Sequence, residues 1–390
     1  MLRFVTAGES HGKCLVGILE GLPAGLQIDP AFINGELRRR QLGYGRGGRM
    51  RIEKDQVEIT SGVRHGRTLG SPVSFFIENR DWKNWREAMS SEPAPDGANL
   101  RPVTRPRPGH VDLAGALKFS THDVRDVLER ASARETAARV AAGAICKLFL
   151  ARFGARFGSH VLAIGRERVP AECESLPVAG ILAIDPEAPV RCADPQAEKT
   201  MTALIDAARK AGDSLGGILE VVAAGLPAGL GTHAQWDRRL DGLIGQALMS
   251  IPACKAVEIG SGVSAAGAFG SEVHDEIFFD EGTHRFYRKT NRAGGIEGGI
   301  SNGQEIRARL YMKPIPTLRK ALRSVDLKSK EPMEASFERS DVCVVPAAAV
   351  IAEAMLALTL ARAFLEKFGG DSMAEVEANF AGYGRLLDSY

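Results

Sequence analysis

The stretch Arg101–Arg139, RPVTRPRPGHVDLAGALKFSTHDVRDVLERASARETAAR, joins a proline- and arginine-rich start to a helix-like end. Proline lacks an amide donor and restricts the residue before it, so the first part is predicted to be a loop. Ser132 followed by Glu135 matches a serine-x-x-glutamate capping box, and apolar residues then recur at helical spacing as far as Leu148. We therefore expect a helix that begins near Arg130–Arg134.

A helix N-terminus beside arginine side chains indicates an anion site, because guanidinium forks and backbone donors both hold phosphate or carboxylate oxygens. The alternative is a solvated basic face with an ordinary helix cap. This stretch alone does not separate the two interpretations.

Bulk composition predicts a globular protein with a sizeable core, since the 390 residues are 44% hydrophobic. The 50 basic and 48 acidic residues give a net charge of +2, so a basic cluster is a local feature and wholesale nucleic-acid binding is disfavoured. The six cysteines are widely spread without a C-x-x-C pair. This spacing favours reduced thiols in a cytoplasmic protein over a zinc site or a disulfide framework.

Neither a signal peptide nor a membrane span is expected. The N-terminus, MLRFVTAGESHGK, has no long apolar run before its charged residues. The most apolar segment, Val342–Leu365, is interrupted by Glu353 and Arg362. We expect a core helix there.

Several blocks of sequence occur twice at a constant offset of 200 residues, which chance similarity of glycine- and alanine-rich strings would not maintain. Alanine-rich helical segments that end at Gly154 and Gly369 follow in the same order. We predict a single domain, residues 1–390, built from two pseudo-repeats (about 1–155 and 205–370) with a proline-rich, partly ordered insert at about 166–199. The repeated blocks are Gly17–Glu20 with Gly217–Glu220, Val57–Ile59 with Val257–Ile259, and Ser61–Val63 with Ser261–Val263.

The repeated unit predicts an α/β (α+β) fold in which helices cover sheets. Short apolar runs indicate strands at Gly17–Gly21, Val57–Ile59 and Val73–Ile77. The segment Pro30–Gln41 starts with proline and favours a helix that ends in three arginines.

Residues that differ between the copies are candidates for chemistry. His11 aligns with Leu215 at an offset of 204, so the fold tolerates an apolar group where the first copy has an imidazole. A histidine in a turn can be a structural polar residue or a catalytic acid, and both interpretations stay open here. His110, directly after the arginine-rich loop, is the second candidate, and the other six histidines are expected to be structural.

The arginines of the first half are predicted to converge on one polyanionic small molecule. Arg40, Arg46 and Arg49 lie on a helix end and a glycine-rich loop whose backbone N–H groups can approach an anion. That loop matches neither the P-loop nor the dinucleotide fingerprint. Arg107 and Arg134 complete the set.

In the second half the candidates are mostly backbone. The glycine-rich segment Arg292–Gly303, followed by KPIPT at Lys313–Thr317, would let a flat ring or a phosphate press against the main chain. Arg339 and Asp341 then place a guanidinium and a carboxylate at the start of the apolar helix.

Six motifs in this order together resemble the chorismate synthase family, from about Thr6 to Gly370. The resemblance implies the chorismate synthase fold, an internally duplicated β-α-β sandwich with helices packed between sheets, in a homotetramer. It implies a lyase of the shikimate pathway, which eliminates phosphate from 5-enolpyruvylshikimate 3-phosphate in a 1,4-trans sense to give chorismate, and which needs reduced FMN without net oxidation. The motifs are GESHG (8–12), RPGHVDL (107–113), RASARETAARVAAGA (130–144), GGIEGGISNGQ (294–304), KPIPTL (313–318) and ERSDVCVVPAAAVIAEAMLA (338–357).

The resemblance also implies roles for individual residues. His11 would protonate the departing phosphate, and His110 would lie beside N1 and the C2 carbonyl of the flavin. Asp341 with Ser10 would relay a proton from flavin N5. The substrate would be bound by Arg40, Arg46, Arg49, Arg107 and Arg134, of which Arg40 and Arg46 are also the NADP candidates.

The FMN contacts that the resemblance implies include two departures from the family pattern. Ala131 replaces the first serine of the usual Arg-Ser-Ser, so only backbone contact is expected there, and Ile315 and Pro316 stand where smaller polar residues are usual. The implied contacts are Arg130, Ala131, Ser132, Pro252, Ala253, Gly298, Lys313, Pro314, Ile315, Pro316, Thr317 and Arg339.

Two other functions are alternatives for this sequence. An RNA-binding module is disfavoured because the loop RPVTRPRPGH has no aromatic stacking platform, so we expect neither a nucleic-acid nor a membrane partner. A bifunctional enzyme would carry its own NADPH-dependent flavin reductase, and the motifs do not decide whether NADPH acts here or on an external reductase.

Overall fold

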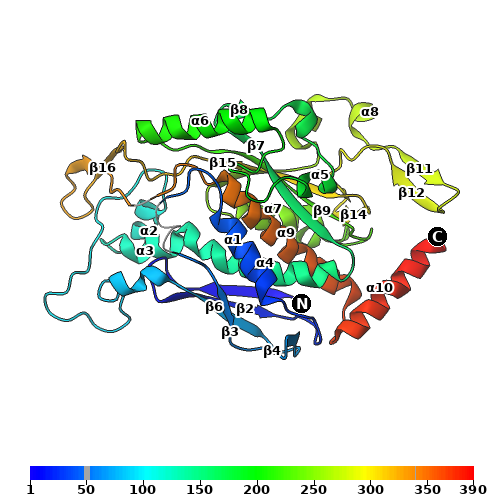
Figure 1. Ribbon diagram of the computed structural model, residues 1–390, viewed down its shortest axis with the longest axis horizontal. Coiled ribbons are helices and arrows are strands. Elements are labelled where there is room, and N and C mark those ends of the chain that lie inside the picture. Colours follow the sequence, from blue (N-terminus) through cyan, green and yellow to red (C-terminus); the bar gives the residue numbers. More distant parts are fainter. Residues whose placement is uncertain (48–52, 339) are drawn as a thin grey trace.

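The computed structural model describes residues 1–47, 53–338 and 340–390, and in that part of the chain two large sheets enclose a layer of helices (Figure 1). Neighbouring strands in both sheets are antiparallel. The first sheet has the order β1 (Arg3–Ala7), β2 (Cys14–Glu20), β6 (Val73–Glu78), β3 (Val57–Ile59). The second has the order β10 (Cys254–Ile259), β15 (Ile306–Met312), β9 (Gly217–Ala224), β7 (Arg156–Ile164), β8 (Glu167–Arg168).

The order β1-β2-β6-β3 in the first sheet corresponds to β7-β9-β15-β10 in the second. Repeated sequence blocks fall on equivalent strands, on β2 and β9 and on β3 and β10. Equivalent helices follow them, α1 (Pro30–Gln41) with α7 (Leu240–Met249) and α4 (Thr136–Ala151) with α9 (Val345–Phe368). This correspondence supports the proposal of a duplicated unit.

The boundaries of the second unit differ from the predicted ones. Strand β7 begins at Arg156 and already belongs to the second sheet, well before the predicted start at residue 205. The segment 166–199 is regular over much of its length, because α5 (Val178–Leu182) packs its buried residues on that sheet and α6 begins within the segment. Its further elements are β8, the 3₁₀ turn η4 (Ala171–Cys173) and the first turns of α6 (Pro195–Ala211).

Helices α4 and α9 pack against each other between the two sheets (Figure 1). Their alanine-rich faces allow a close approach, and a Cβ atom placed on Gly143 would lie 2.4 Å from the Cβ of Ala354. Helix α9 is long and apolar enough to cross a membrane, but 83% of its most apolar window is buried within the fold. It is the core helix that the apolar segment predicted.

Helix α1 spans the predicted residues. The Asp29 side chain accepts a hydrogen bond of 2.9 Å from the amide of Ala31, and Pro30 occupies the first helical position. Arg38, Arg39 and Arg40 form the last turn. The first sheet confirms strands near all three predicted positions.

The helix start predicted near Arg130–Arg134 is wrong. The chain forms a separate helix α3 (Arg125–Ala131), then the 3₁₀ turn η3 (Ala133–Glu135), and α4 begins only at Thr136. Ser132 Oγ accepts from the amide of Arg134 at 3.3 Å and so caps the 3₁₀ turn, not the helix. The Glu135 carboxylate pairs with Arg139 one turn on, 2.8 Å away, so it is not available to complete a capping box.

The remaining elements are short or lie outside the two sheets. Helix α2 follows the proline-rich loop, which is irregular as expected, and α10 carries the chain away from the core after α9 (Figure 1). These remaining elements are β4 (Val63–Arg64), β5 (Arg67–Thr68), η2 (Arg80–Asn84), α2 (Asp112–Phe119), η5 (Trp236–Arg238), η6 (Gly262–Gly267), α8 (Gly270–Val273), β11 (Ile277–Asp280), β12 (Arg285–Arg288), β13 (Ile296–Glu297), β14 (Ile300–Ser301), β16 (Arg323–Val325), β17 (Pro332–Glu334) and α10 (Met373–Asp388).

Candidate active site

A cavity of about 400 Å³ lies where the two halves meet, and we call it the junction cavity. One wall comes from the first half, including the turn after β1 and the stretch around η3, and the other from the segments that flank β10, β15 and α9. Predicted site residues that line it are Ser10, His11, Arg40, Arg46, Arg107, His110, Ala131, Ser132, Arg134, Pro252, Ala253, Lys313, Ile315, Pro316, Thr317 and Asp341.

Three predicted FMN residues do not line this cavity. Arg130 donates to the carbonyl oxygens of Gly8 and Thr6 at 2.9 and 2.8 Å, so its guanidinium fastens α3 to the first strand. Gly298 is at the tip of the β13–β14 hairpin with a φ of +59°, and Pro314 lies between two lining residues. Arg49 and Arg339 lie outside the described residues.

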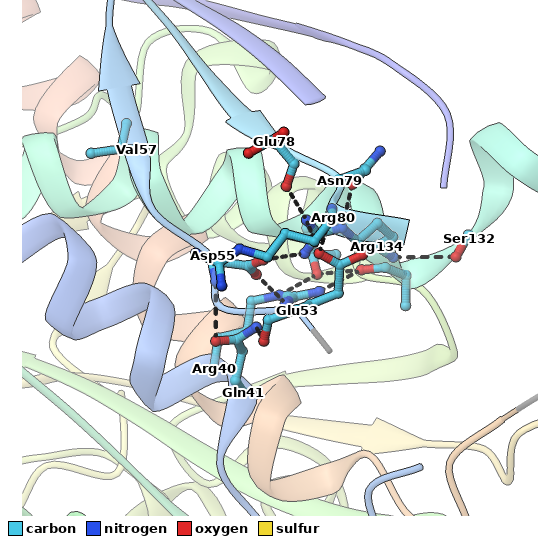
Figure 2. A network of polar contacts seen from close by, with 12 residues as sticks. Arg40, Gln41, Glu53, Asp55, Val57, Glu78, Asn79, Arg80, Ser132 and Arg134 are labelled. Carbon is cyan, nitrogen blue, oxygen red and sulfur yellow. Dashed lines mark hydrogen bonds and ion pairs between the residues drawn. The ribbon is translucent and has the colours of Figure 1, made fainter. Parts of the chain in front are cut away.

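Arg40 and Arg134 share one buried carboxylate, that of Asp55 (Figure 2). Arg134 Nη1 lies 2.5 Å from Asp55 Oδ1, and Arg40 Nη1 lies 3.3 Å from Asp55 Oδ2. Arg134 Nε also donates to Asn79 Oδ1 at 2.9 Å. Arg40 donates further to Thr136 Oγ1 and to the Ala133 carbonyl, at 3.0 Å each. These bonds fix both guanidinium groups beside the start of α4.

The pKa of Arg40 falls to about 10, because burial disfavours its charged form more strongly than Asp55 supports it. Only 3% of this residue is exposed. Arg40 therefore lines the cavity as a buried residue, unlike a solvated surface arginine.

The other two described arginines of the predicted set are also paired. Arg46 Nη1 donates to Asp341 Oδ2 at 2.7 Å, and the amide of Gly47 donates to Asp341 Oδ1 at 2.5 Å. Arg107 binds Asp112 through Nε at 2.8 Å and Thr317 Oγ1 through Nη1 at 2.9 Å. The four described guanidinium groups thus line one cavity, and each is partly neutralised by a carboxylate, since an unpaired buried charge is costly.

His11 lies in the turn between β1 and β2 and is held by Glu129 of α3. Its Nδ1 is 2.9 Å from Glu129 Oε1, and its backbone amide donates to Glu129 Oε2 at 2.8 Å. The imidazole stacks on the indole of Trp85 with 4.0 Å between ring centroids. Burial alone would raise the pKa of the Glu129 carboxyl, but the hydrogen bonds from His11 and the charge of Arg125 outweigh it and lower that pKa.

His110 has a similar arrangement on another side of the cavity. Its Nδ1 contacts Asp112 Oδ1, and Arg107 Nη2 lies 3.1 Å from the same nitrogen. Asp112 is fully buried. Burial would raise its pKa, but the hydrogen bonds from His110 and Arg107 hold it well below its usual value.

The wall from the second half is largely apolar, with a few donors at its edge. Met312 and Ile351 contribute apolar side chains to it, and Ala253 adopts a φ of +71° that turns the backbone at that point. Lys313 Nζ donates to the carbonyl of Gly109, and burial with the nearby charge of Lys255 lowers the Lys313 pKa. Such a surface can receive a flat ring that ends in an anionic group.

The sequence analysis did not identify the carboxylates that pair with the candidate histidines and arginines. Asp112 and Glu129 lie within the stretch quoted at the outset, two residues after His110 and one before Arg130, so a search for acids beside candidate histidines could have found Asp112. Nothing in a single sequence links Asp55 to Arg134 or Trp85 to His11. Among the described residues, His, Cys, Asp and Glu side chains form no group of three or more that could hold a metal ion.

Comparisons with known proteins agree with one another. The sequence model of the family described as chorismate synthase matches residues 2–365. Proteins named chorismate synthase from Solibacter usitatus and Aquifex aeolicus are 55% and 54% identical to the chain; both alignments cover 100% of it, with 100% and 99% of the relative. A crystal structure of a chorismate synthase superimposes with a TM-score of 0.80 at 44% identity and covers 100% of this chain and 99% of that one.

Proposed function

The chain belongs to the chorismate synthase family of lyases, and from that premise we propose the reaction that it catalyses. It eliminates phosphate from 5-enolpyruvylshikimate 3-phosphate in a 1,4-trans sense and so forms chorismate, with reduced FMN as the cofactor. Substrate and flavin would both bind in the junction cavity.

One observation carries this proposal. The junction cavity brings together both candidate histidines, described arginines of the first half and the segment around Lys313–Thr317 of the second. His11 and Lys313 are 302 residues apart in sequence, and a purely structural role would not require these residues around one cavity. Their chemistry matches a substrate that carries a phosphate and two carboxylates.

His11 is proposed to act on the leaving phosphate. Because Nδ1 faces the Glu129 carboxylate, the imidazole would donate its proton to the phosphate oxygen through Nε2. Arg40 and Arg134, locked by Asp55, would set the position of the phosphate beside it. Arg46, Arg49 and Arg107 are proposed to hold the other anionic groups.

The described residues fit FMN in their chemistry. Pro252, Ala253 and Ile315 offer apolar surface for a flat ring, while Lys313 and Thr317 supply polar groups for its phosphate end or ring edge. When bound, reduced FMN would supply an electron to the breaking bond and recover it afterwards. The proposed contacts also include Gly298 and Arg339, of which Gly298 lies on a hairpin away from the cavity lining.

His110 is proposed to govern the charge at the N1 side of the flavin, and Asp341 with Ser10 to move a proton at the N5 side. Asp341 is now held by Arg46 and by the amide of Gly47, with 19% of its side chain exposed. An anionic group of the substrate that takes over the Arg46 contact would release Asp341 for this task.

FMN could be reduced by the enzyme itself with NADPH or by an external reductase. Arg40 and Arg46 are the NADP contacts that the family resemblance implies, so an intrinsic NADPH-dependent flavin reductase is the bifunctional form of this enzyme. Turnover in air with NADPH and FMN, without an added reductase, would support that form. Its absence under conditions where chemically reduced FMN sustains turnover would assign reduction to an external partner.

We also propose a homotetramer in the cytoplasm. The outer face of the first sheet exposes 49% of Val5 and 43% of Ile18, and the β11–β12 hairpin exposes 58% of Phe286. Apolar surface of this kind favours contacts between chains. Light scattering of the purified protein should give the mass of four chains, and a monomeric mass would contradict this part of the proposal.

The activity itself is tested with the phosphorylated substrate and chemically reduced FMN without oxygen. We expect phosphate release and chorismate absorbance in equal amounts. His11→Ala and His110→Ala should each lose about 10²–10⁴-fold in kcat with little change in KM, the usual contribution of a general acid or base. His122→Ala is the matched control, because His122 is exposed and outside the cavity lining. Wild-type turnover in either cavity variant would remove that histidine from the mechanism.

A further inference from the structure

Glu129 contacts the turn that carries His11 through both its backbone and its side chain. The backbone carbonyl of Glu129 accepts from the amide of Ser10 at 3.0 Å, and its carboxylate accepts from the amide of His11 at 2.8 Å. Both carboxylate oxygens also lie within 3.0 Å of His11 Nδ1. Backbone and ring of His11 are therefore fixed by the same side chain.

This contact determines which ring nitrogen carries the proton. An ionised carboxylate only accepts hydrogen bonds, so Nδ1 must be the N–H nitrogen of the neutral imidazole. The lowered pKa of Glu129 keeps the carboxylate ionised at neutral pH. Nε2 is then the ring nitrogen without a hydrogen in the neutral imidazole, and the carboxylate charge lies 2.9 Å from Nδ1.

Other charged groups lie close to His11 and Glu129 and modify the electrostatic interaction between them. Arg125, on the helix of Glu129, donates to Glu129 Oε1 at 2.8 Å, and Glu338 lies 3.3 Å from Arg125 Nη2. Asp81 of η2 accepts from the indole N–H of Trp85, the ring on which His11 stacks. Arg101 lies over that indole at 4.6 Å, and Arg125 at 5.0 Å.

We propose that Glu129 is a positioning residue for His11: it holds the imidazole in the Nδ1–H form and supports its doubly protonated state, so that Nε2 is the proton donor toward the junction cavity. Arg125 weakens this effect because its guanidinium group pairs with the same carboxylate. The part of this inference that concerns catalysis rests on the proposed function, whereas the part that concerns the state of the ring does not.

The state of the ring can be read without substrate through Trp85. A doubly protonated imidazole stacked on an indole quenches its fluorescence more strongly than the neutral ring does. With Trp82→Phe and Trp236→Phe, Trp85 is the sole tryptophan of the three in the chain. In this background we expect the fluorescence to rise with pH in one transition, which His11→Ala removes and His122→Ala leaves in place.

Glu129→Gln keeps a hydrogen-bond acceptor but removes the charge. The midpoint of the transition should move to lower pH by about 1–2 units, the usual effect of losing an opposite charge in contact. Arg125→Gln should move it to higher pH, because Glu129 then acts on His11 alone. Opposite shifts distinguish an electrostatic role from a general disturbance of the fold, and the second variant decides if the first does not fold. Midpoints unchanged in the folded variants would overturn the proposal.

The rate profile separates this inference from the proposed function. If His11 is the acid, the basic limb of kcat/KM in Glu129→Gln should move to lower pH by the same amount as the fluorescence midpoint. A fluorescence midpoint that moves while the rate profile stays fixed would retain the role of Glu129 and contradict the role of His11 as the acid.

Discussion

At the scale of single residues, charge pairing determines what the junction cavity can offer a ligand. The four described arginines of the predicted substrate site each reach the wall already bonded to a carboxylate. A guanidinium that is fixed in this way loses little conformational freedom when an anion arrives. The cavity is therefore preorganised, and its positive charge is partly offset by carboxylates, in contrast to an open basic patch.

Asp55 pairs with two of these four arginines, Arg40 and Arg134. Asp55→Asn would leave Arg40 and Arg134 buried with one less negative charge, which typically costs about 3–5 kcal/mol of folding free energy. Chemical denaturation at neutral pH measures this loss. The matched control is Glu187→Gln, which breaks the exposed pair with Arg38 and should cost no more than about 1 kcal/mol. Equal losses of folding free energy in the two variants would show that the buried Asp55 pairs stabilise the fold no more than an exposed ion pair does.

Residue types at the site were predictable from the sequence, whereas their partners were not. The motifs carry His11, His110 and Asp341 because each stands in a distinctive local context. Asp55 and Arg134, in contrast, are 79 residues apart, and only the packing of η3 against the chain after α1 brings them together. A single sequence contains no signal for such a pair.

At the scale of elements, the helix ends show when local patterns suffice. Helix α1 was predicted at both ends because Pro30 marks its start and the arginines 38–40 its last turn, and the structure adds Asp29 as the cap at its start. The start of α4 was not, because the Glu135 carboxylate has a closer partner in Arg139 and the serine caps a 3₁₀ turn. A capping pattern predicts a helix start only where its side chains have no better partners.

The contact between α4 and α9 depends on Gly143. Its Cβ position lies 2.4 Å from the Ala354 side chain and 2.5 Å from Ala354 Cα, so Gly143→Ala must push the helices apart. We expect a loss of about 1–3 kcal/mol, measured by chemical denaturation. Gly35→Ala in α1 is the control, because its Cβ meets open space and alanine should gain about 0.5–1 kcal/mol. Stabilisation by both substitutions would contradict the packing described here.

The helical layer also contains a buried ion cluster that should make stability depend on acid. Glu353 of α9 is fully buried and bonded to Arg39 of α1, and Lys147 of α4 binds both Glu353 and Glu36. Burial would raise the pKa values of both carboxyls, but the charges of Arg39 and Lys147 outweigh it and lower them. A lowered folded-state pKa gives stability that is present above the ordinary value of 4.5 and lost as pH falls below it.

This cluster gives a prediction for Glu353→Gln. At pH 7 the variant should lose about 3–5 kcal/mol, because Arg39 and Lys147 lose a buried partner. Below pH 4.5 the free energy of unfolding should fall less steeply than in the wild type, since one of the titrating carboxyls is gone. Denaturation curves at several pH values test both points, and parallel pH slopes in the two proteins would count against the assignment.

At the scale of the whole molecule, the proposed duplication accounts both for what was predictable and for what was not. Constant offsets between blocks predicted two related halves and a layered fold, because the copies retain the residues that build equivalent strands. The offsets could not show that β7 is the counterpart of β1 or that α10 follows the second unit, since neither β7 nor α10 lies in a repeated sequence block. Nor could they show that residues of both halves line one cavity.

The central claim is that the junction cavity holds the phosphorylated substrate against FMN. A crystal structure of the complex with both ligands tests it most directly. We expect the substrate phosphate beside His11, Arg40 and Arg134, with the flavin ring against the wall that includes Pro252 and Lys313–Thr317. A complex in which the substrate or the flavin binds outside the junction cavity would contradict the account.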